Sequence, residues 1–152
     1  MIQLTRTNSS NQDFQDLVKE LDAYLKITDG DDHDFYNQFN GLEKIKHALV
    51  VYKNHKPIGC GAFREFDLST VEVKRMYLQP DERGAGIAAE ILQSLEMWAK
   101  ELGYKRTILE TGDRQVEAVK FYYKSGYQRI PNYGQYAQMD NSNCFEKILD
   151  EL

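Results

Sequence analysis

The stretch that decides the fold runs from Val73 to Ala88 and reads VKRMYLQPDERGAGIA. Its first part, Val73–Leu78, is typical of a buried strand, and from Ile87 onward apolar residues recur at helical spacing. Gly84 and Gly86 lie between the two, where small residues let a ligand approach the backbone closely. Because the N-terminus of a helix presents unpaired N–H groups, this stretch predicts a phosphate-binding turn between a strand and a helix.

The segments before this stretch predict a strand, a helix and an antiparallel meander. Expected strands cover 2–6, 47–53, 57–66 and 70–79, and expected helices cover 14–25 and 35–42. The turns between the last three strands are so short that these strands must run antiparallel.

The segments after it predict a long helix over 87–102, a strand over 106–110, a helix over 115–124, and strands over 127–130 and 144–149. We therefore expect one domain over residues 1–152 of the α/β (α+β) class. Its sheet should be mixed but mostly antiparallel, with helices on both faces.

The composition excludes several classes of protein. The chain has 152 residues, which fits one domain, and its charge is 19 − 24 = −5, which argues against a nucleic-acid partner. The longest apolar run, Ala48–Tyr52, is far too short to cross a membrane. Two isolated cysteines favour a reducing, cytoplasmic location, and the three histidines show no spacing typical of a metal site. We expect no metal.

The glycine-rich turn has three interpretations. It could be a turn that starts a helix without binding a ligand. The segment Gly84–Ala89 also satisfies the dinucleotide-binding pattern G-x-G-x-x-A, and Glu110 ends the next strand, where a ribose-binding acid could lie. We reject that interpretation because a dinucleotide fold needs repeated strand–helix units, whereas a tight meander precedes this turn. A third interpretation, a phosphate loop, would require the motif G-x-x-x-x-G-K-[ST], which the sequence lacks.

Three motifs together carry a resemblance to a known family. Arg83–Ala88 matches R/Q-x-x-G-x-G/A, Val73–Pro80 is similar to the strand that leads into that motif, and Ala118–Tyr127 is similar to A-x-x-x-Y-x-x-x-G-F/Y. The motifs follow one another in the same order and at the same spacing as in the GCN5-related N-acetyltransferases. The sequence resembles this family, called GNAT, over about residues 70–130.

The resemblance implies how acetyl-CoA would be bound. The backbone of Met76, Tyr77 and Leu78 would pair with the pantetheine arm, and an N–H near Leu78 would face the thioester oxygen. The pyrophosphate would be held by the turn and helix start, namely Arg83, Gly84, Ala85, Gly86, Ile87 and Ala88. Gln115 stands where the family often has an asparagine that contacts the cofactor or caps the helix; the amide is kept, and the side chain is longer by one methylene.

The resemblance also implies the catalytic residues. Tyr122 matches the tyrosine that protonates the departing CoA thiolate, whereas the neighbouring Tyr123 would point elsewhere around the helix. The base that deprotonates the amine could be Glu110, Glu72 or a water. We expect Glu72 to alternate in phase with Lys74 and Met76 along its strand. Neither cysteine lies near the motif residues, so we expect direct transfer without an acyl-enzyme.

The acceptor is a primary amine that the sequence does not identify. The acidic segment Asp29–Asp34 could be a solvated loop, or it could line the acceptor site and favour a cationic amine. Tyr133–Tyr136 could form the opposite wall. Two rival functions stay open, a non-catalytic acyl-CoA-binding module and a nucleotide-binding oxidoreductase. The chain could be a monomer or a homodimer.

Overall fold

The computed structural model describes residues 1–29 and 45–151, and for Asp29 and Glu151 it describes the backbone only. The helix expected over 35–42 and most of the acidic segment 29–34 therefore lie outside the described residues. The strands are β1 (Ile2–Thr7), β2 (His47–Lys53), β3 (Lys56–Asp67), β4 (Thr70–Leu78), β5 (Arg106–Gly112), β6 (Gln128–Ile130) and β7 (Ser142–Ile148). The α-helices are α1 (Gln12–Asp29), α3 (Ile87–Glu101) and α4 (Val116–Lys124).

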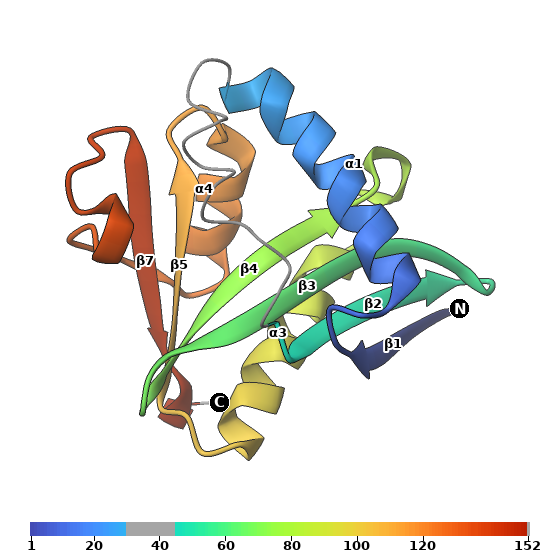
Figure 1. The fold of residues 1–152 in the computed structure, drawn as a ribbon, viewed down its shortest axis with the longest axis horizontal. Coiled ribbons are helices and arrows are strands. Elements are labelled where there is room, and N and C mark those ends of the chain that lie inside the picture. The colour runs from blue at the N-terminus through green and yellow to red at the C-terminus, as the bar shows by residue number, and fades with distance from the viewer. Residues whose placement is uncertain (30–44, 152) are drawn as a thin grey trace.

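All seven strands join one sheet in the order β1-β2-β3-β4-β5-β7-β6 (Figure 1). β1 to β4 form the expected antiparallel meander, and Asn54 and His55 turn the chain between β2 and β3 with positive φ angles of 52° and 69°. β4 and β5 run parallel, and the remaining pairs are antiparallel, so the sheet is mixed and mostly antiparallel as expected.

Helices cover both faces of the sheet, which confirms the predicted architecture. The apolar stripe of α1, with Phe14, Leu17, Val18 and Leu21, packs on one face against Ala48, Val50, Cys60 and Ala62. On the other face, α3 packs Ile91 and Leu95 against the sheet, and α4 adds Tyr122. We call these the α1 face and the α3/α4 face. Burial of the two apolar faces is the main force that holds the three layers together.

β4 is interrupted by a β-bulge at Arg75. The strand register runs from Ala62 opposite Lys74 to Cys60 opposite Tyr77, so two residues of β4 lie opposite the single residue Gly61. Arg75 takes a positive φ of 61°, which is uncommon for a residue with a side chain. The Cys60 thiol donates a hydrogen bond of 3.3 Å to the Arg75 carbonyl, and Gly61 leaves room for the Met76 side chain.

The bulge overturns the expectation that Glu72, Lys74 and Met76 share one face. Met76 packs with the core on the α3/α4 face, whereas Tyr77 packs with the core on the α1 face. Because Val73 also belongs to the α3/α4 core, its neighbours Glu72 and Lys74 face α1. Alternation therefore changes phase at the bulge, and Met76 lies on the face opposite to Lys74.

A buried polar network ties α3 to the sheet on the α3/α4 face. The Glu96 carboxylate, only 1% exposed, accepts hydrogen bonds from the Tyr127 hydroxyl at 2.9 Å and the Lys147 ammonium at 3.1 Å. Tyr127 also shares a 2.7 Å hydrogen bond with Thr107. The network provides partners for a charge that would otherwise be costly to bury, and it holds Tyr127 in place, three residues after the end of α4.

Candidate active site

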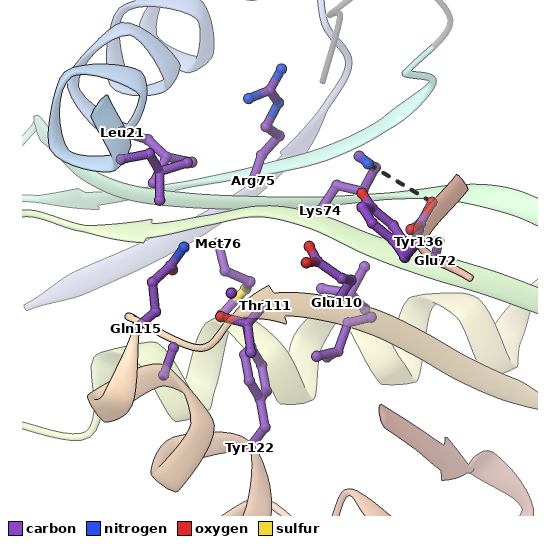
Figure 2. A pocket seen from close by; sticks show the side chains of 15 residues that line it. Leu21, Glu72, Lys74, Arg75, Met76, Glu110, Thr111, Gln115, Tyr122 and Tyr136 are labelled. Carbon is purple, nitrogen blue, oxygen red and sulfur yellow. Dashed lines mark ion pairs between the residues drawn. The ribbon is translucent and has the colours of Figure 1, made fainter. Parts of the chain in front are cut away.

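The candidate site is a wedge-shaped opening between β4 and β5. These strands pair only over Thr70–Glu72 and Arg106–Ile108, and beyond this point they diverge. The opening holds a cavity of about 130 Å³ that passes from one face of the sheet to the other. It is lined by Leu21, Leu25, Glu72, Val73, Lys74, Arg75, Met76, Leu109, Glu110, Thr111, Gly112, Gln115, Ala118, Tyr122 and Tyr136 (Figure 2).

The lining residues divide between the two faces. Leu109 belongs to the α3/α4 core, so the next residue along β5, Glu110, faces the α1 side. Tyr136 contributes to a separate small core with Cys144, which lies opposite Glu110 in the β5–β7 ladder. In Figure 2, Arg75 lies above β4 and Tyr122 lies below it, with Glu110 between them. The opening thus has charged side chains of both signs on its α1 side and the Tyr122 side chain on its α4 side.

Tyr122 is the tyrosine of α4 that reaches the opening. It is 8% exposed and packs against Tyr127 and Phe145, whereas the neighbouring Tyr123 is 50% exposed. Burial, and secondarily the negative charge of Glu110, raises the pKa of the Tyr122 hydroxyl well above its usual value. Tyr122 therefore carries its proton at neutral pH.

Glu72 is buried and already engaged by neighbouring side chains. One carboxylate oxygen accepts a hydrogen bond from the Arg64 Nε at 3.1 Å, and the other accepts one from the Tyr133 hydroxyl at 2.7 Å. The ammonium of Lys74 adds an ion pair at 3.9 Å. Both carboxylate oxygens are therefore occupied by side chains of the protein, and Glu72 orders the residues around the opening.

Glu110 is half-buried at the far end of β5 and lies on the wall of the cavity. It is close enough to Tyr122 and Lys74 for its charge to affect the pKa values of both. The structure also places Cys144 directly opposite Glu110 in the β5–β7 ladder, and Cys60 beneath the bulge of β4. Our expectation that both cysteines lie away from the motif residues was therefore wrong.

Neither cysteine is activated. Burial raises the pKa of the Cys144 thiol to about 11, and it raises the pKa of the Cys60 thiol further still. Both side chains are fully buried and stay protonated at neutral pH. A thiol in this state is a poor nucleophile.

The glycine-rich turn forms the start of α3. Gly84 and Gly86 have positive φ angles of 93° and 80°, and Gly86 precedes the helix without a side-chain cap. A Cβ atom at either glycine would have no atom within 4 Å, so the space above the turn is open. The first N–H groups of α3, from Ile87 and Ala88 onward, lack intrahelical partners and lie next to this open space.

The Arg83 side chain folds back onto the end of β4. Its Nε donates a hydrogen bond of 3.1 Å to the Leu78 carbonyl, and its guanidinium lies 5.4 Å from the centre of the Tyr24 ring. Arg83 therefore links the turn to β4 and α1. Ala85, between the two glycines, is exposed.

The backbone of Met76, Tyr77 and Leu78 lies beyond the pairing with β5. On the other edge, Tyr77 and Leu78 pair with Cys60 and Gly59 of β3. The β5-facing edge of this segment is therefore available for a further strand. Gln115 caps α4 by position, without a side-chain cap hydrogen bond, and its side chain lines the cavity (Figure 2).

Sequence reasoning missed two members of the site. Lys74 was seen only as part of an alternating strand, yet it lines the cavity and is 8% exposed. Arg64 lies opposite Glu72 on β3 and holds its carboxylate. The signal for Lys74 was present, because a charged residue between Val73 and Met76 is unusual in a buried strand. Tyr136 lines the wall of the opening, and the hydroxyl of Tyr133 donates a hydrogen bond to Glu72.

Two general features complete the description. Within residues 1–29 and 45–151, no group of three or more His, Cys, Asp or Glu side chains could hold a metal ion. In the same part of the chain, no helix is both long and apolar enough to span a membrane.

Comparison with known proteins identifies the family. The model of the acetyltransferase (GNAT) family matches residues 13–127. An IAA acetyltransferase of Azospirillum brasilense is 31% identical over 135 residues, which cover 88% of each chain. A candidate acyl-CoA N-acyltransferase of Klebsiella pneumoniae has a similar structure, with a TM-score of 0.82, 27% identity and 98% of each chain covered.

A more distant structure, an N-acetyltransferase of Thermoplasma acidophilum in complex with coenzyme A, has a TM-score of 0.73 at 17% identity and covers 97% of this chain and 99% of its own. It shares the fold. The matched family model spans the meander, the glycine-rich turn and the helix that carries Tyr122. The chain therefore belongs to the GNAT family of acetyltransferases and is an acyltransferase.

Proposed function

We propose that this protein is an acetyl-CoA-dependent N-acetyltransferase that transfers the acetyl group directly to a primary amine. The observation that carries the proposal is the placement of Tyr122 and Glu110 on the two sides of one opening in the sheet. A protonated hydroxyl and a carboxylate in this arrangement suit a reaction that needs one acid and one base.

The part of the chain that would bind acetyl-CoA is the α3/α4 side of the opening. The open turn at Gly84 and Gly86 and the N–H groups of Ile87 and Ala88 suit the pyrophosphate. The β5-facing edge of 76–78 suits the pantetheine arm, which would add as an extra strand. The Thermoplasma structure of the same fold is a complex with coenzyme A, which supports this class of ligand.

The acceptor amine would enter from the α1 side. An alkylammonium has a pKa near 10.4, so at neutral pH it must lose a proton before it attacks the thioester. Glu110 is our preferred base, because Glu72 is held by Arg64 and Tyr133. The amine would then attack the carbonyl carbon, the C–S bond would break, and Tyr122 would protonate the CoA thiolate.

The protonated state of the cysteines favours direct transfer. An acyl-enzyme would need a thiolate, and both Cys60 and Cys144 are buried thiols with raised pKa values. A ternary complex of enzyme, acetyl-CoA and amine is the alternative that needs no such group.

The test combines binding and turnover. Calorimetric titration with acetyl-CoA and with NAD should show binding of acetyl-CoA alone, and an amine panel should show release of free CoA thiol. Tyr122→Phe should lower kcat about 100-fold or more with acetyl-CoA affinity retained. Tyr123→Phe is the matched control, one residue away and exposed, and should leave kcat unchanged. Binding of acetyl-CoA without turnover of any amine would instead favour the non-catalytic acyl-CoA-binding module.

A cytoplasmic location and a monomeric or homodimeric state are also part of the proposal and rest on the sequence alone. Cell fractionation and a native mass measurement test them.

A further inference from the structure

Lys74 is a buried cation whose hydrogen-bonding capacity is not used within the described residues. The residue is 8% exposed and lines the cavity, and its ammonium makes an ion pair with Glu72 at 3.9 Å. Its three N–H groups donate no hydrogen bond to an acceptor within residues 1–29 and 45–151. Because Lys74 lines the cavity, these donors can bind an oxygen ligand that enters it.

Two arginines near the opening have carboxylate partners. Arg75 contacts Asp22 at 3.2 Å, and Arg64 contacts Glu72 at 3.1 Å. Lys74 and Glu110 bring one charge of each sign to the cavity wall, and both face the α1 side. Burial lowers the pKa of Lys74, while Glu72 and Glu110 act in the opposite direction.

We propose that the acceptor is a zwitterion of the amino-acid type, with its amine toward Glu110 and its carboxylate on Lys74. This inference rests on the proposed function and specifies its second substrate. A carboxylate supplies the oxygen acceptors that the Lys74 ammonium lacks. An amine beside it reaches the base within the same small cavity.

The same geometry discriminates against other acceptors. A diamine would bring its second ammonium close to Lys74, and like charges in a partly desolvated site repel strongly. A simple alkylamine would leave Lys74 without a ligand. Leu21 and Leu25 of α1 line the same cavity and give an apolar surface for the side chain of an amino acid.

The experiment compares acceptors that differ only in the carboxylate. Release of CoA thiol is measured with L-leucine, L-leucinamide and isoamylamine, with L-phenylalanine, L-phenylalaninamide and phenethylamine, and with L-lysine and cadaverine. The whole set of common L-amino acids and their carboxamides is screened in the same way. We expect the amino acid of the preferred pair to exceed its carboxamide and its decarboxylated amine in kcat/KM by about 10- to 100-fold, the range for a hydrogen-bonded charge pair.

Variants then assign this preference to Lys74. Lys74→Met removes the charge but keeps a long, unbranched side chain, and it should reduce the preference for the amino acid to within about threefold. Lys74→Arg should retain part of this preference. Lys56→Met, an exposed lysine at the β2–β3 turn, is the matched control and should preserve it. Acetyl-CoA affinity should be equal in all variants.

The outcomes separate the two proposals. If carboxamides or decarboxylated amines react as well as the amino acids, or if only diamines react, acetyl transfer holds and the zwitterion proposal is wrong. The same conclusion follows if Lys74→Met keeps the full preference. If acetyl-CoA binds and no amine of any kind releases CoA, the proposed function fails, and the acceptor assignment fails with it.

Discussion

Glu72 and Glu110 are both candidate bases, and the structure predicts that replacing each by glutamine gives a different result. The substitutions Glu72→Gln and Glu110→Gln change size very little and remove one negative charge each. Glu72 is 2% exposed and has partners on both oxygens, while Glu110 is half-buried on the wall of the cavity. The first change should therefore affect stability, and the second should affect turnover.

The cost of Glu72→Gln follows from its contacts. A hydrogen bond to a charged group contributes about 1.5–3 kcal/mol, and the 2.7 Å bond from the half-buried Tyr133 reaches a carboxylate that is only 2% exposed. The Arg64 side chain is 43% exposed, so its ion pair adds less than about 1 kcal/mol. A neutral amide recovers part of both contacts. The net loss is about 2 to 3 kcal/mol, which lowers Tm by about 4 to 12 °C in a chain of this length.

Glu110→Gln should lower kcat/KM at neutral pH by about 100-fold or more, the effect of losing a general base. Its Tm should fall less than that of Glu72→Gln. Since the amine must then lose its proton to solvent, the rate of the variant should rise about tenfold per pH unit until the pH approaches the pKa of the acceptor amine.

Thermal unfolding and CoA thiol release over a range of pH measure both effects on the same samples. Glu65→Gln on β3, an exposed glutamate, is a suitable control for the loss of one charge. If Glu72→Gln abolishes turnover at unchanged Tm while Glu110→Gln stays active, then the assignment of the two carboxylates is the wrong way round.

Three further predictions concern the scaffold around the opening. Gly61→Ala places a Cβ 2.8 Å from a methyl group of Leu95 and 2.9 Å from the sulfur of Met76. Denaturant unfolding should therefore show a loss of about 1–3 kcal/mol in the free energy of unfolding; an unchanged unfolding midpoint would contradict this account of the bulge. Lys147→Met leaves the buried Glu96 with one donor fewer, and it should cost about 1–3 kcal/mol, less than for a fully buried pair because Lys147 is 21% exposed. Adding Glu96→Gln should recover part of that loss, which additive single effects would not do. Cys144, with its pKa raised to about 11, should react with a disulfide reagent at pH 8 about 100-fold more slowly in the folded protein than in urea, and equal rates would show that the thiol is not buried as described.

Much of the fold was predictable from local patterns. The meander follows from the short turns at 54–55 and 68–69, and the helices follow from apolar residues at helical spacing. The order of the elements within the described residues agrees with expectation. What local patterns do not contain is the pairing of distant strands, and here β7 enters between β5 and β6. That insertion is what brings Cys144 beside Glu110.

The site was predictable in its motifs but not in its electrostatics. The motif spacing selected Tyr122 and predicted that Tyr123 points elsewhere around the helix; in the structure Tyr122 lines the cavity and Tyr123 is exposed. The division of charges was not predictable, because it depends on a bulge that simple alternation of side chains does not reveal. The partners of Glu72 come from strand β3 and from the segment near residue 133, which is remote in sequence.

The bulge at Arg75 also constrains how β4 can change over evolution. Deleting one residue between Lys74 and Tyr77 would remove the bulge and restore regular alternation, while Tyr77 and Leu78 would stay opposite Cys60 and Gly59 and keep their faces. A second deletion in this part of β4 would find no extra residue to remove and would exchange the faces, so that Tyr77 would leave the core beneath α1 and Leu78 would leave the core beneath α3. During evolution, β4 should therefore accept the loss of one residue at the bulge, whereas the loss of a second should be strongly selected against.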